Sequence, residues 1–131
     1  MAKQLNPDER ARLKKLFTEN GLSPADVFVH NHFTIITRTG IEKIQAKKKI
    51  SVSYQIEKLD PVFVVVKAFA EMDTEEGEVR VETYGESSPK NTNNSYPVAM
   101  AEKRALSRAV LKLAGLYSEP GLIGEDEKPD E

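Results

Sequence analysis

Four basic residues on one predicted helix are the side chains of this sequence best suited to a chemical task. Arg104, Arg108 and Lys112 are spaced four residues apart in a segment rich in alanine and leucine, and Lys103 adjoins them. In a helix this spacing aligns the side chains along one line of about 12 Å, at a rise of about 1.5 Å per residue. A rigid row of cations suits the phosphates of a nucleic-acid strand. The row is also typical of a solvated helix face, and the sequence alone leaves both interpretations open.

A second basic cluster and two tyrosines could extend such a surface. Lys47, Lys48 and Lys49 directly precede a predicted strand, so they could border the same groove. Tyr84 and Tyr96 flank the polar loop that leads into the helix. Aromatic rings can stack on unpaired bases. The sequence therefore predicts these five residues as further contacts to DNA.

Catalytic and metal chemistry find no support in the residue patterns. The chain has no cysteine, which excludes disulfides, thiolate catalysis and cysteine-based metal sites. It also lacks the Gly-x-x-x-x-Gly-Lys pattern of phosphate loops and the Gly-x-Ser-x-Gly pattern of serine hydrolases. His30 and His32 are the only histidines, and no third ligand follows at a clear spacing. We expect a protein that is not an enzyme and that holds no metal and no cofactor.

Length and composition favour a single soluble domain. The chain has 131 residues, of which 39% are hydrophobic and 31% are charged. One core usually serves about 100–200 residues. No run of apolar residues is long enough to cross a membrane, and the N-terminal residues lack the apolar stretch of a secretory signal. A cytoplasmic protein is the expectation.

The hydrophobic pattern predicts an α+β domain over residues 1–118. An antiparallel sheet of three or four strands is expected to be backed by helices, in the order α-β-β-β-α with a long C-terminal helix. Phe63 and Phe69, six residues apart on one strand, are expected in the core. Gly85 is expected to end the last strand. The predicted elements are a helix up to about residue 20, strands over 33–37, 50–57, 62–70 and 78–84, a short helix between about 39 and 48, a loop over 86–95 and a helix over 98–114.

The last residues differ in charge from the rest of the chain. Residues 119–131 carry six acidic side chains against Lys128 alone, so their net charge is -5, and the preceding 118 residues sum to +3. Such acidic tails are usually disordered and solvating, which is the expectation here. A second hypothesis is that the tail competes with an anionic ligand for a basic surface.

The residues around the basic helix resemble a known family. Residues 79–117 are similar to the core of phage single-strand annealing proteins of the Rad fifty-two superfamily. The shared pattern is a strand with a terminal glycine, a polar loop and a helix with a Lys-Arg-Ala-Leu motif, here Gly85, 86–95 and 103–106. The resemblance extends over about residues 32–118 when the upstream strands are included.

The resemblance implies a β-β-β-α core that binds single-stranded DNA in a basic groove and anneals complementary strands in recombination or repair. It implies a homo-oligomer, as a ring or filament, and a recombination nuclease as a further partner. For a phage-encoded protein it also implies the cytoplasm of a bacterial host cell. The basic contacts of the family on this helix would correspond to Lys103, Arg104 and Arg108. The sequence departs from the family in its acidic pI of 5.8 and its short length.

Two other functions are compatible with the sequence. A double-stranded RNA binding module has the order α-β-β-β-α, with lysines at the start of its last helix. The late start of the basic row and the extra short helix argue against that module. A non-enzymatic protein-interaction module, in which the basic helix face is only solvated, is the other alternative.

Overall fold

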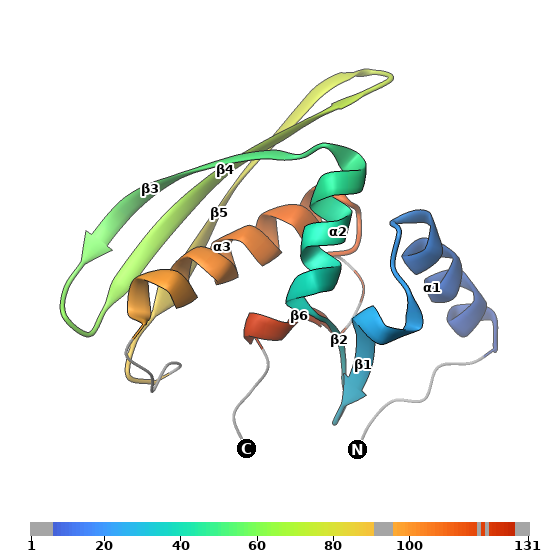
Figure 1. Cartoon of the computed structure of the whole chain (residues 1–131), viewed down its shortest axis with the longest axis horizontal. Coiled ribbons are helices and arrows are strands. Elements are labelled where there is room, and N and C mark those ends of the chain that lie inside the picture. The colour runs from blue at the N-terminus through green and yellow to red at the C-terminus, as the bar shows by residue number, and fades with distance from the viewer. Residues whose placement is uncertain (1–6, 91–95, 118, 120, 128–131) are drawn as a thin grey trace.

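The chain adopts an α+β fold with two three-stranded sheets, described here from a computed structural model for residues 7–90, 96–117, 119 and 121–127 (Figure 1). The helices are α1 (Pro7–Glu19), α2 (Arg38–Lys48) and α3 (Pro97–Leu113), with short 3-10 helices η1 (Pro24–Asp26) and η2 (Glu125–Glu127). The strands are β1 (Val27–His30), β2 (Phe33–Ile36), β3 (Ser51–Leu59), β4 (Val64–Thr74), β5 (Gly77–Ser87) and β6 (Leu122–Gly124). The predicted fold class and the long C-terminal helix are confirmed. The predicted antiparallel sheet forms with three strands, and a second three-stranded sheet forms that the sequence does not predict.

The larger sheet is antiparallel, in the order β3-β4-β5. Thr74 pairs with Gly77 across a two-residue turn, which confirms the predicted hairpin. β4 is the central strand, as its run of β-branched and aromatic residues predicts. The strand β5 does not end at Gly85 but continues to Ser87.

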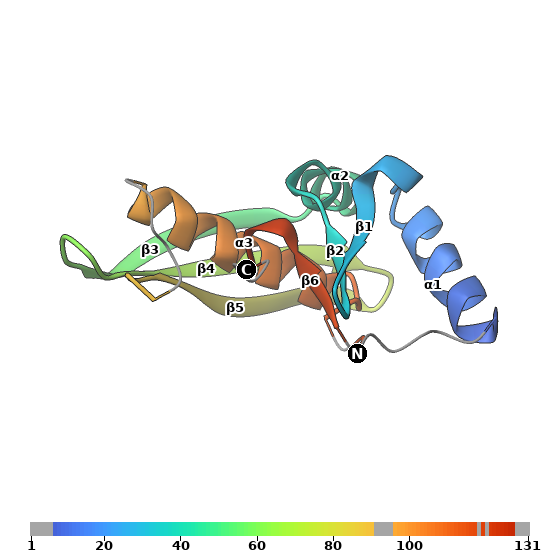
Figure 2. The same cartoon turned by 90° about the horizontal axis from the view of Figure 1, so that it is seen from below.

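The helix α3 packs on one face of this sheet, over β4 and β5 (Figures 1 and 2). Side chains on that face are small, and those of the contacting helix turns are mostly alanine, so the two elements approach closely. A Cβ atom at Gly85 would lie 2.0 Å from the carbonyl oxygen of Ala101 and 2.4 Å from the amide nitrogen of Ala105. Thr83 adds a buried hydrogen bond of 2.7 Å from its hydroxyl to the carbonyl oxygen of Ala105. Glycine is therefore required where helix and strand cross.

The opposite face of the larger sheet is open, since no described helix or strand lies over it (Figures 1 and 2). Strand residues alternate between faces, and the buried members of β4 are Val64, Val66, Ala68 and Ala70. The residues between them lie on the open face. The expectation that Phe63 and Phe69 belong to the core is wrong, because Phe63 is 39% exposed and Phe69 lies on the open face.

The smaller sheet joins distant parts of the chain, in the order β1-β2-β6. β1 and β2 form an antiparallel hairpin, and β6 adds to β2 in parallel with Thr34 opposite Leu122. Neither β1 nor β6 is predicted from the sequence. Residues 121–127 are ordered against the domain, and Leu122 belongs to the core, so the expectation of a disordered tail is wrong for them. Residues 128–131 of the predicted tail and 91–95 of the predicted loop lie outside the described residues.

We predict that Gly85→Ala lowers the free energy of unfolding by about 3 kcal/mol, because a methyl group there collides with the backbone of α3. Urea unfolding followed by circular dichroism measures the loss. Gly115→Ala is the matched control, since its φ of 78° is left-handed but nothing lies within 4 Å of the new Cβ. That control should cost about 1 kcal/mol. Equal, small losses in both variants would contradict the close crossing.

Candidate nucleic-acid interface

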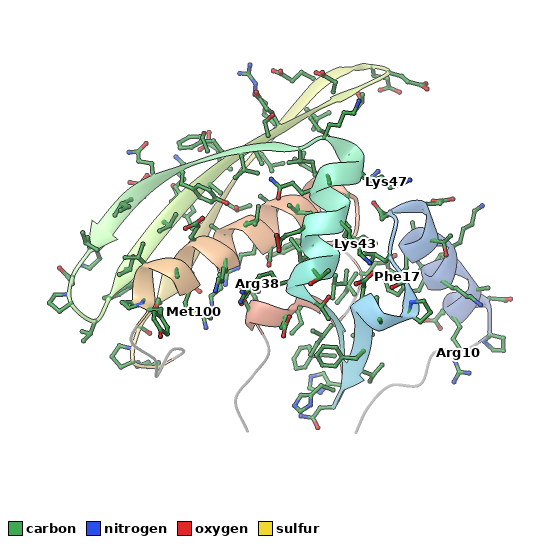
Figure 3. The ribbon with its side chains drawn as sticks, in the orientation of Figure 1. Arg10, Phe17, Arg38, Lys43, Lys47 and Met100 are labelled. Atoms are coloured by element: carbon green, nitrogen blue, oxygen red, sulfur yellow. The ribbon has the colours of Figure 1, made fainter. Side chains whose placement is uncertain are left out.

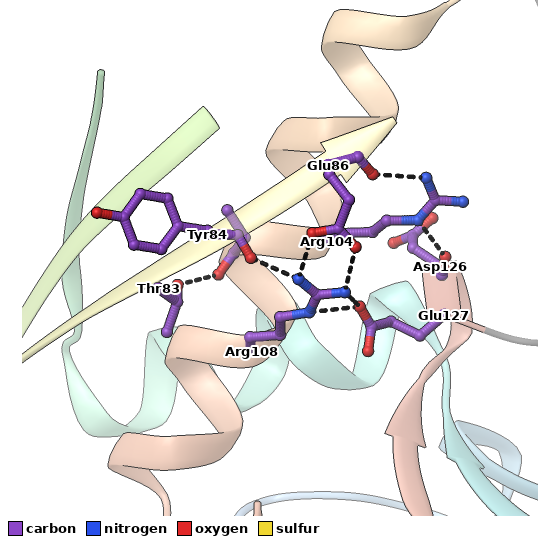
Figure 4. A network of polar contacts seen from close by, with 8 residues as sticks. Thr83, Tyr84, Glu86, Arg104, Arg108, Asp126 and Glu127 are labelled. Carbon is purple, nitrogen blue, oxygen red and sulfur yellow. Dashed lines mark hydrogen bonds and ion pairs between the residues drawn. The ribbon is translucent and has the colours of Figure 1, made fainter. Parts of the chain in front are cut away.

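The predicted basic row begins at Arg104, whose side chain is buried with 7% of its surface exposed. Its guanidinium donates from Nε to the carbonyl oxygen of Asp126 at 3.0 Å and from Nη1 to the carbonyl oxygen of Glu86 at 2.9 Å (Figure 4). The first acceptor belongs to η2 and the second to the end of β5. Arg104 therefore joins three elements instead of facing solvent.

Arg108, one turn further along α3, binds two carboxylates. Its Nη1 and Nη2 each donate to one oxygen of Glu86 at 3.0 Å, and its Nη1 also donates to the carbonyl oxygen of Tyr84 at 2.6 Å. Glu127 of η2 accepts from the same guanidinium (Figure 4). Burial disfavours the charged guanidinium, but hydrogen bonds to Glu86 and Glu127 outweigh it and raise the pKa of Arg108. The hydrogen bond from Arg108 in turn lowers the pKa of Glu86.

The expectation of an outward track along α3 is therefore wrong for Arg104 and Arg108. Both arginines lie on the side of the helix that meets η2, and their guanidinium groups are hydrogen-bonded within the fold. Lys112 is exposed, with its ammonium 5.1 Å from the ring centroid of Tyr117, and Lys103 is half-buried. The reason for the error is the acidic segment. The sequence predicts that this segment is disordered, so the arginines are expected to have no partners within the fold. In the structure, Asp126 and Glu127 of this segment accept hydrogen bonds from them.

Other carboxylates of the C-terminal segment also bind arginines. The side chain of Arg38 at the start of α2 donates to the Asp126 carboxylate at 3.0 Å, and the Arg38 amide donates to Glu125 at 2.9 Å. Arg12 of α1 forms an ion pair with Glu119. The segment 119–127 thus links all three helices. That it competes with an anionic ligand stays a prediction.

The lysine cluster 47–49 lies apart from these arginines. Lys47 and Lys48 occupy the last turn of α2, and Lys49 ends the helix with a left-handed φ of 54°. Arg38 is at the opposite end of α2, about 15 Å away along the helix axis (Figure 3). The structure therefore does not bring the lysine cluster and the arginines of α3 into one groove.

The two predicted tyrosines also lie in different places. Tyr96 is 67% exposed, directly before α3. Tyr84 is 49% exposed, and its position opposite Lys67 in the register of β4 and β5 places its ring on the open sheet face. Tyr84 belongs to a cluster of aromatic and cationic side chains on that face.

That cluster on the open face centres on Lys67. The Lys67 ammonium lies 5.1 Å from the ring centroid of Phe69 and 5.5 Å from that of Tyr84, and it pairs with the carboxylate of Glu82 at 2.8 Å. The hydrogen bond with Glu82 raises the pKa of Lys67, so its ammonium stays charged. Sequence reasoning missed Lys67 and Phe69. The alternation of small apolar residues at 64, 66, 68 and 70 with larger side chains was the available signal.

The open face continues beyond this cluster in both directions. Towards the end of β3, the Lys58 ammonium lies 5.4 Å from the ring centroid of Phe63. Towards the hairpin, Arg80 pairs with Glu71 and Glu78. A hollow of about 470 Å³ lies between these strands, with Phe69 and Arg80 among its lining residues. We refer to Lys58, Phe63, Lys67, Phe69 and Tyr84 as the aromatic–lysine face.

Comparisons with known proteins identify no relative. No protein-family model, no curated protein and no solved structure matches the chain. Within the described ranges, no group of three or more histidine, aspartate or glutamate side chains is placed to hold a metal ion. None of the helices described is both long enough and apolar enough to span a bilayer.

We predict that Arg104→Ala lowers the free energy of unfolding by about 3 kcal/mol, because the carbonyl groups of Glu86 and Asp126 lose a buried donor. Thermal and urea unfolding measure the change. Lys112→Ala, at an exposed position of the same helix, is the control and should change stability by no more than about 0.5 kcal/mol. Full stability of Arg104→Ala would show that the arginine is not a structural link.

The lowered pKa of Glu86 predicts a pH dependence of stability. A carboxylate whose pKa is lowered by folding stabilises the protein above its unfolded pKa of about 4.3, and this contribution is lost as the pH falls through the lower folded value. Wild-type protein should therefore lose more stability than Glu86→Gln between about pH 5 and pH 2. The difference should vanish when both carry Arg108→Gln, and its persistence would assign the effect to another group.

Proposed function

We propose that the protein binds single-stranded DNA through the aromatic–lysine face and promotes annealing of complementary strands, without catalysing a reaction. The resemblance of residues 79–117 to single-strand annealing proteins supports this proposal. The order β3-β4-β5-α3 agrees with the β-β-β-α core that the resemblance implies. The site proposed here differs from the expected one, because the arginines of α3 are bound within the fold.

The observation that carries the proposal is the position of the Lys67 ammonium near two aromatic rings on the open face of the sheet, those of Phe69 and Tyr84. Aromatic side chains on a sheet provide planes on which unpaired bases stack. An ammonium group beside the rings can neutralise a phosphate of the same strand. Because Glu82 already pairs with Lys67, a bound phosphate would have to replace or share that contact.

Stacking is compatible with annealing because it engages the flat face of a base. The hydrogen-bonding edge of a stacked base remains available for a second strand. A homo-oligomer, as the resemblance implies, would align several such faces along one strand. A recombination nuclease and a cytoplasmic location belong to the same proposal.

Double-stranded RNA binding is a second candidate, favoured by the order of elements. The helix α2 precedes all three strands of the larger sheet and does not interrupt them, so residues 38–113 follow the order α-β-β-β-α. The sequence argument against this module from an interposed helix is therefore wrong. The late start of the basic row in α3 still argues against it, since the first six residues of that helix contain no lysine or arginine.

A protein-interaction function is favoured by the surface of β3. This edge strand carries an apolar row on the side of α3 that the helix leaves partly exposed, with Tyr54 39%, Ile56 50% and Leu59 62% exposed. Exposed apolar rows on edge strands commonly mark contacts with other chains. The same row could serve the homo-oligomer, so this candidate and the main proposal differ in whether DNA binds at all.

We predict that Tyr84→Ala weakens binding of a labelled oligothymidine about tenfold and slows annealing, because one stacking plane is lost. Fluorescence anisotropy at two salt concentrations measures affinity, and binding should weaken steeply at the higher one. Tyr117→Ala, with a similarly exposed tyrosine off this face, should bind as the wild type does.

Four results would reject parts of this proposal. Unchanged binding by Tyr84→Ala and Lys67→Gln, together with weaker binding by Lys103→Gln and Lys112→Gln, would return the site to α3. Weaker binding after substitution of Lys47, Lys48 and Lys49 alone would place it at the end of α2. Preferential competition by duplex RNA would favour the RNA-binding module, and no salt-sensitive binding of either nucleic acid would favour protein interaction.

A further inference from the structure

A groove between α1 and β1 is not used by the fold or by the proposed function. Its volume is about 470 Å³, and its apolar lining includes Leu13 and Phe17 of α1, Leu22, and Val27 and Val29 of β1. In both cartoon views α1 lies on the far side of β1 from β2 (Figures 1 and 2). Figure 3 shows Phe17 on the side of α1 that faces the rest of the molecule.

The walls of this groove are unusually apolar for an exposed surface. Val29 is 72% exposed although it lies within a strand, and no residue of α1 is fully buried. Leu16, Phe17 and Val27 pack against the core but are only partly buried. A helix with one apolar side and an apolar strand thus face each other without filling the space between them, as in ligand grooves of about 300–1,000 Å³.

The strand that forms one wall is also the edge of its sheet. Among the strands of the described residues, β1 pairs with β2 alone, and His30 pairs with Phe33 across a two-residue turn. In such a hairpin the residues that flank the turn exchange hydrogen bonds, and backbone groups alternate in direction. The N–H and C=O groups of Val29 therefore point away from β2, towards the free edge. An extended chain could pair with them.

The rim of the groove is positively charged. Arg10 and Lys14 of α1 line it, one helical turn apart, and neither has an ion-pair partner among the described residues (Figure 3 labels Arg10). Other cations of α1 differ in this respect, since Arg12 pairs with Glu119 and Lys15 lies 4.0 Å from Glu19. The rim therefore selects for negative charge on whatever occupies the groove.

We propose that this groove binds an extended peptide segment of a partner protein, which adds to β1 as a further strand. Alternate apolar side chains of the segment would contact Phe17 and Leu22, and acidic residues would face Arg10 and Lys14. This combination of strand edge and side-chain pockets is how sheet edges recognise extended peptides. A fatty acid would satisfy the apolar walls and the charge, but it has no backbone to pair with Val29.

The test uses the full chain and a labelled heptapeptide in which valine alternates with glutamate. Saturable binding by fluorescence anisotropy is expected, and its affinity should decrease with salt. The same peptide with N-methyl groups on alternate amides keeps its side chains but cannot form strand hydrogen bonds, so its binding should be at least about tenfold weaker. Equal binding of the methylated peptide, or no binding of the unmodified one, would overturn strand addition.

Two neighbouring lysines provide the matched variants. Lys14→Glu should weaken peptide binding about fivefold to tenfold, and Lys15→Glu, next in sequence but outside the groove lining, should leave it unchanged. Val29→Glu should also weaken binding while the protein stays folded, because Val29 is already exposed. Equal effects of the two lysine variants would overturn the assigned rim.

Other occupants give different results in the same set of measurements. Binding of a fluorescent fatty acid, together with no measurable binding of the peptide, would assign the groove to a lipid. Self-association by light scattering that Val29→Glu abolishes would assign it to a second copy of the chain. The groove lies away from the aromatic–lysine face, so oligothymidine binding should be the same in wild type and Lys14→Glu whichever result is obtained.

Discussion

The close crossing of α3 over β5 determines the arrangement of the larger sheet. Because Gly85 has no side chain, the helix backbone at Ala101 and Ala105 can approach the strand closely. The hydroxyl of Thr83 donates a hydrogen bond that stabilises this contact. Because the helix lies directly on β4 and β5, it cannot also cover β3, which is left with an exposed apolar row. The same placement leaves the far side of the sheet open, where lysines and aromatic rings gather.

The position of α3 also determines the role of its arginines. From this helix Arg104 and Arg108 reach past the end of β5, where the C-terminal segment supplies carbonyl and carboxylate acceptors. These two arginines, which would suit a polyanion, therefore bind groups of the protein itself. The cations of α3 outside this network are Lys103 and Lys112, and on the aromatic–lysine face Lys58 and Lys67 lie beside rings. A surface of this composition favours contacts with bases as much as with phosphates.

Local patterns predicted the fold better than they predicted the site. The turn after Thr74, the central strand β4 and the helices α2 and α3 follow from periodicity and turn residues within short windows. The strands β1 and β6 have four and three residues, and β6 forms through pairing with β2, so no short window contains their signal. The orientation of Arg104 depended on that same distant segment. The spacing of Phe63 and Phe69 predicts a shared strand face but does not say which face of the sheet α3 covers, so the core position expected for them is wrong.

The parallel pairing of β2 with β6 has a consequence for biosynthesis. Thr34 lies opposite Leu122, so the middle strand of the small sheet has only one neighbour until nearly the whole described chain has left the ribosome. The hairpin of β4 and β5 joins adjacent segments and can form much earlier. A nascent chain would therefore expose one side of β2 while its larger sheet is already assembled, and closure of the small sheet would be the last step.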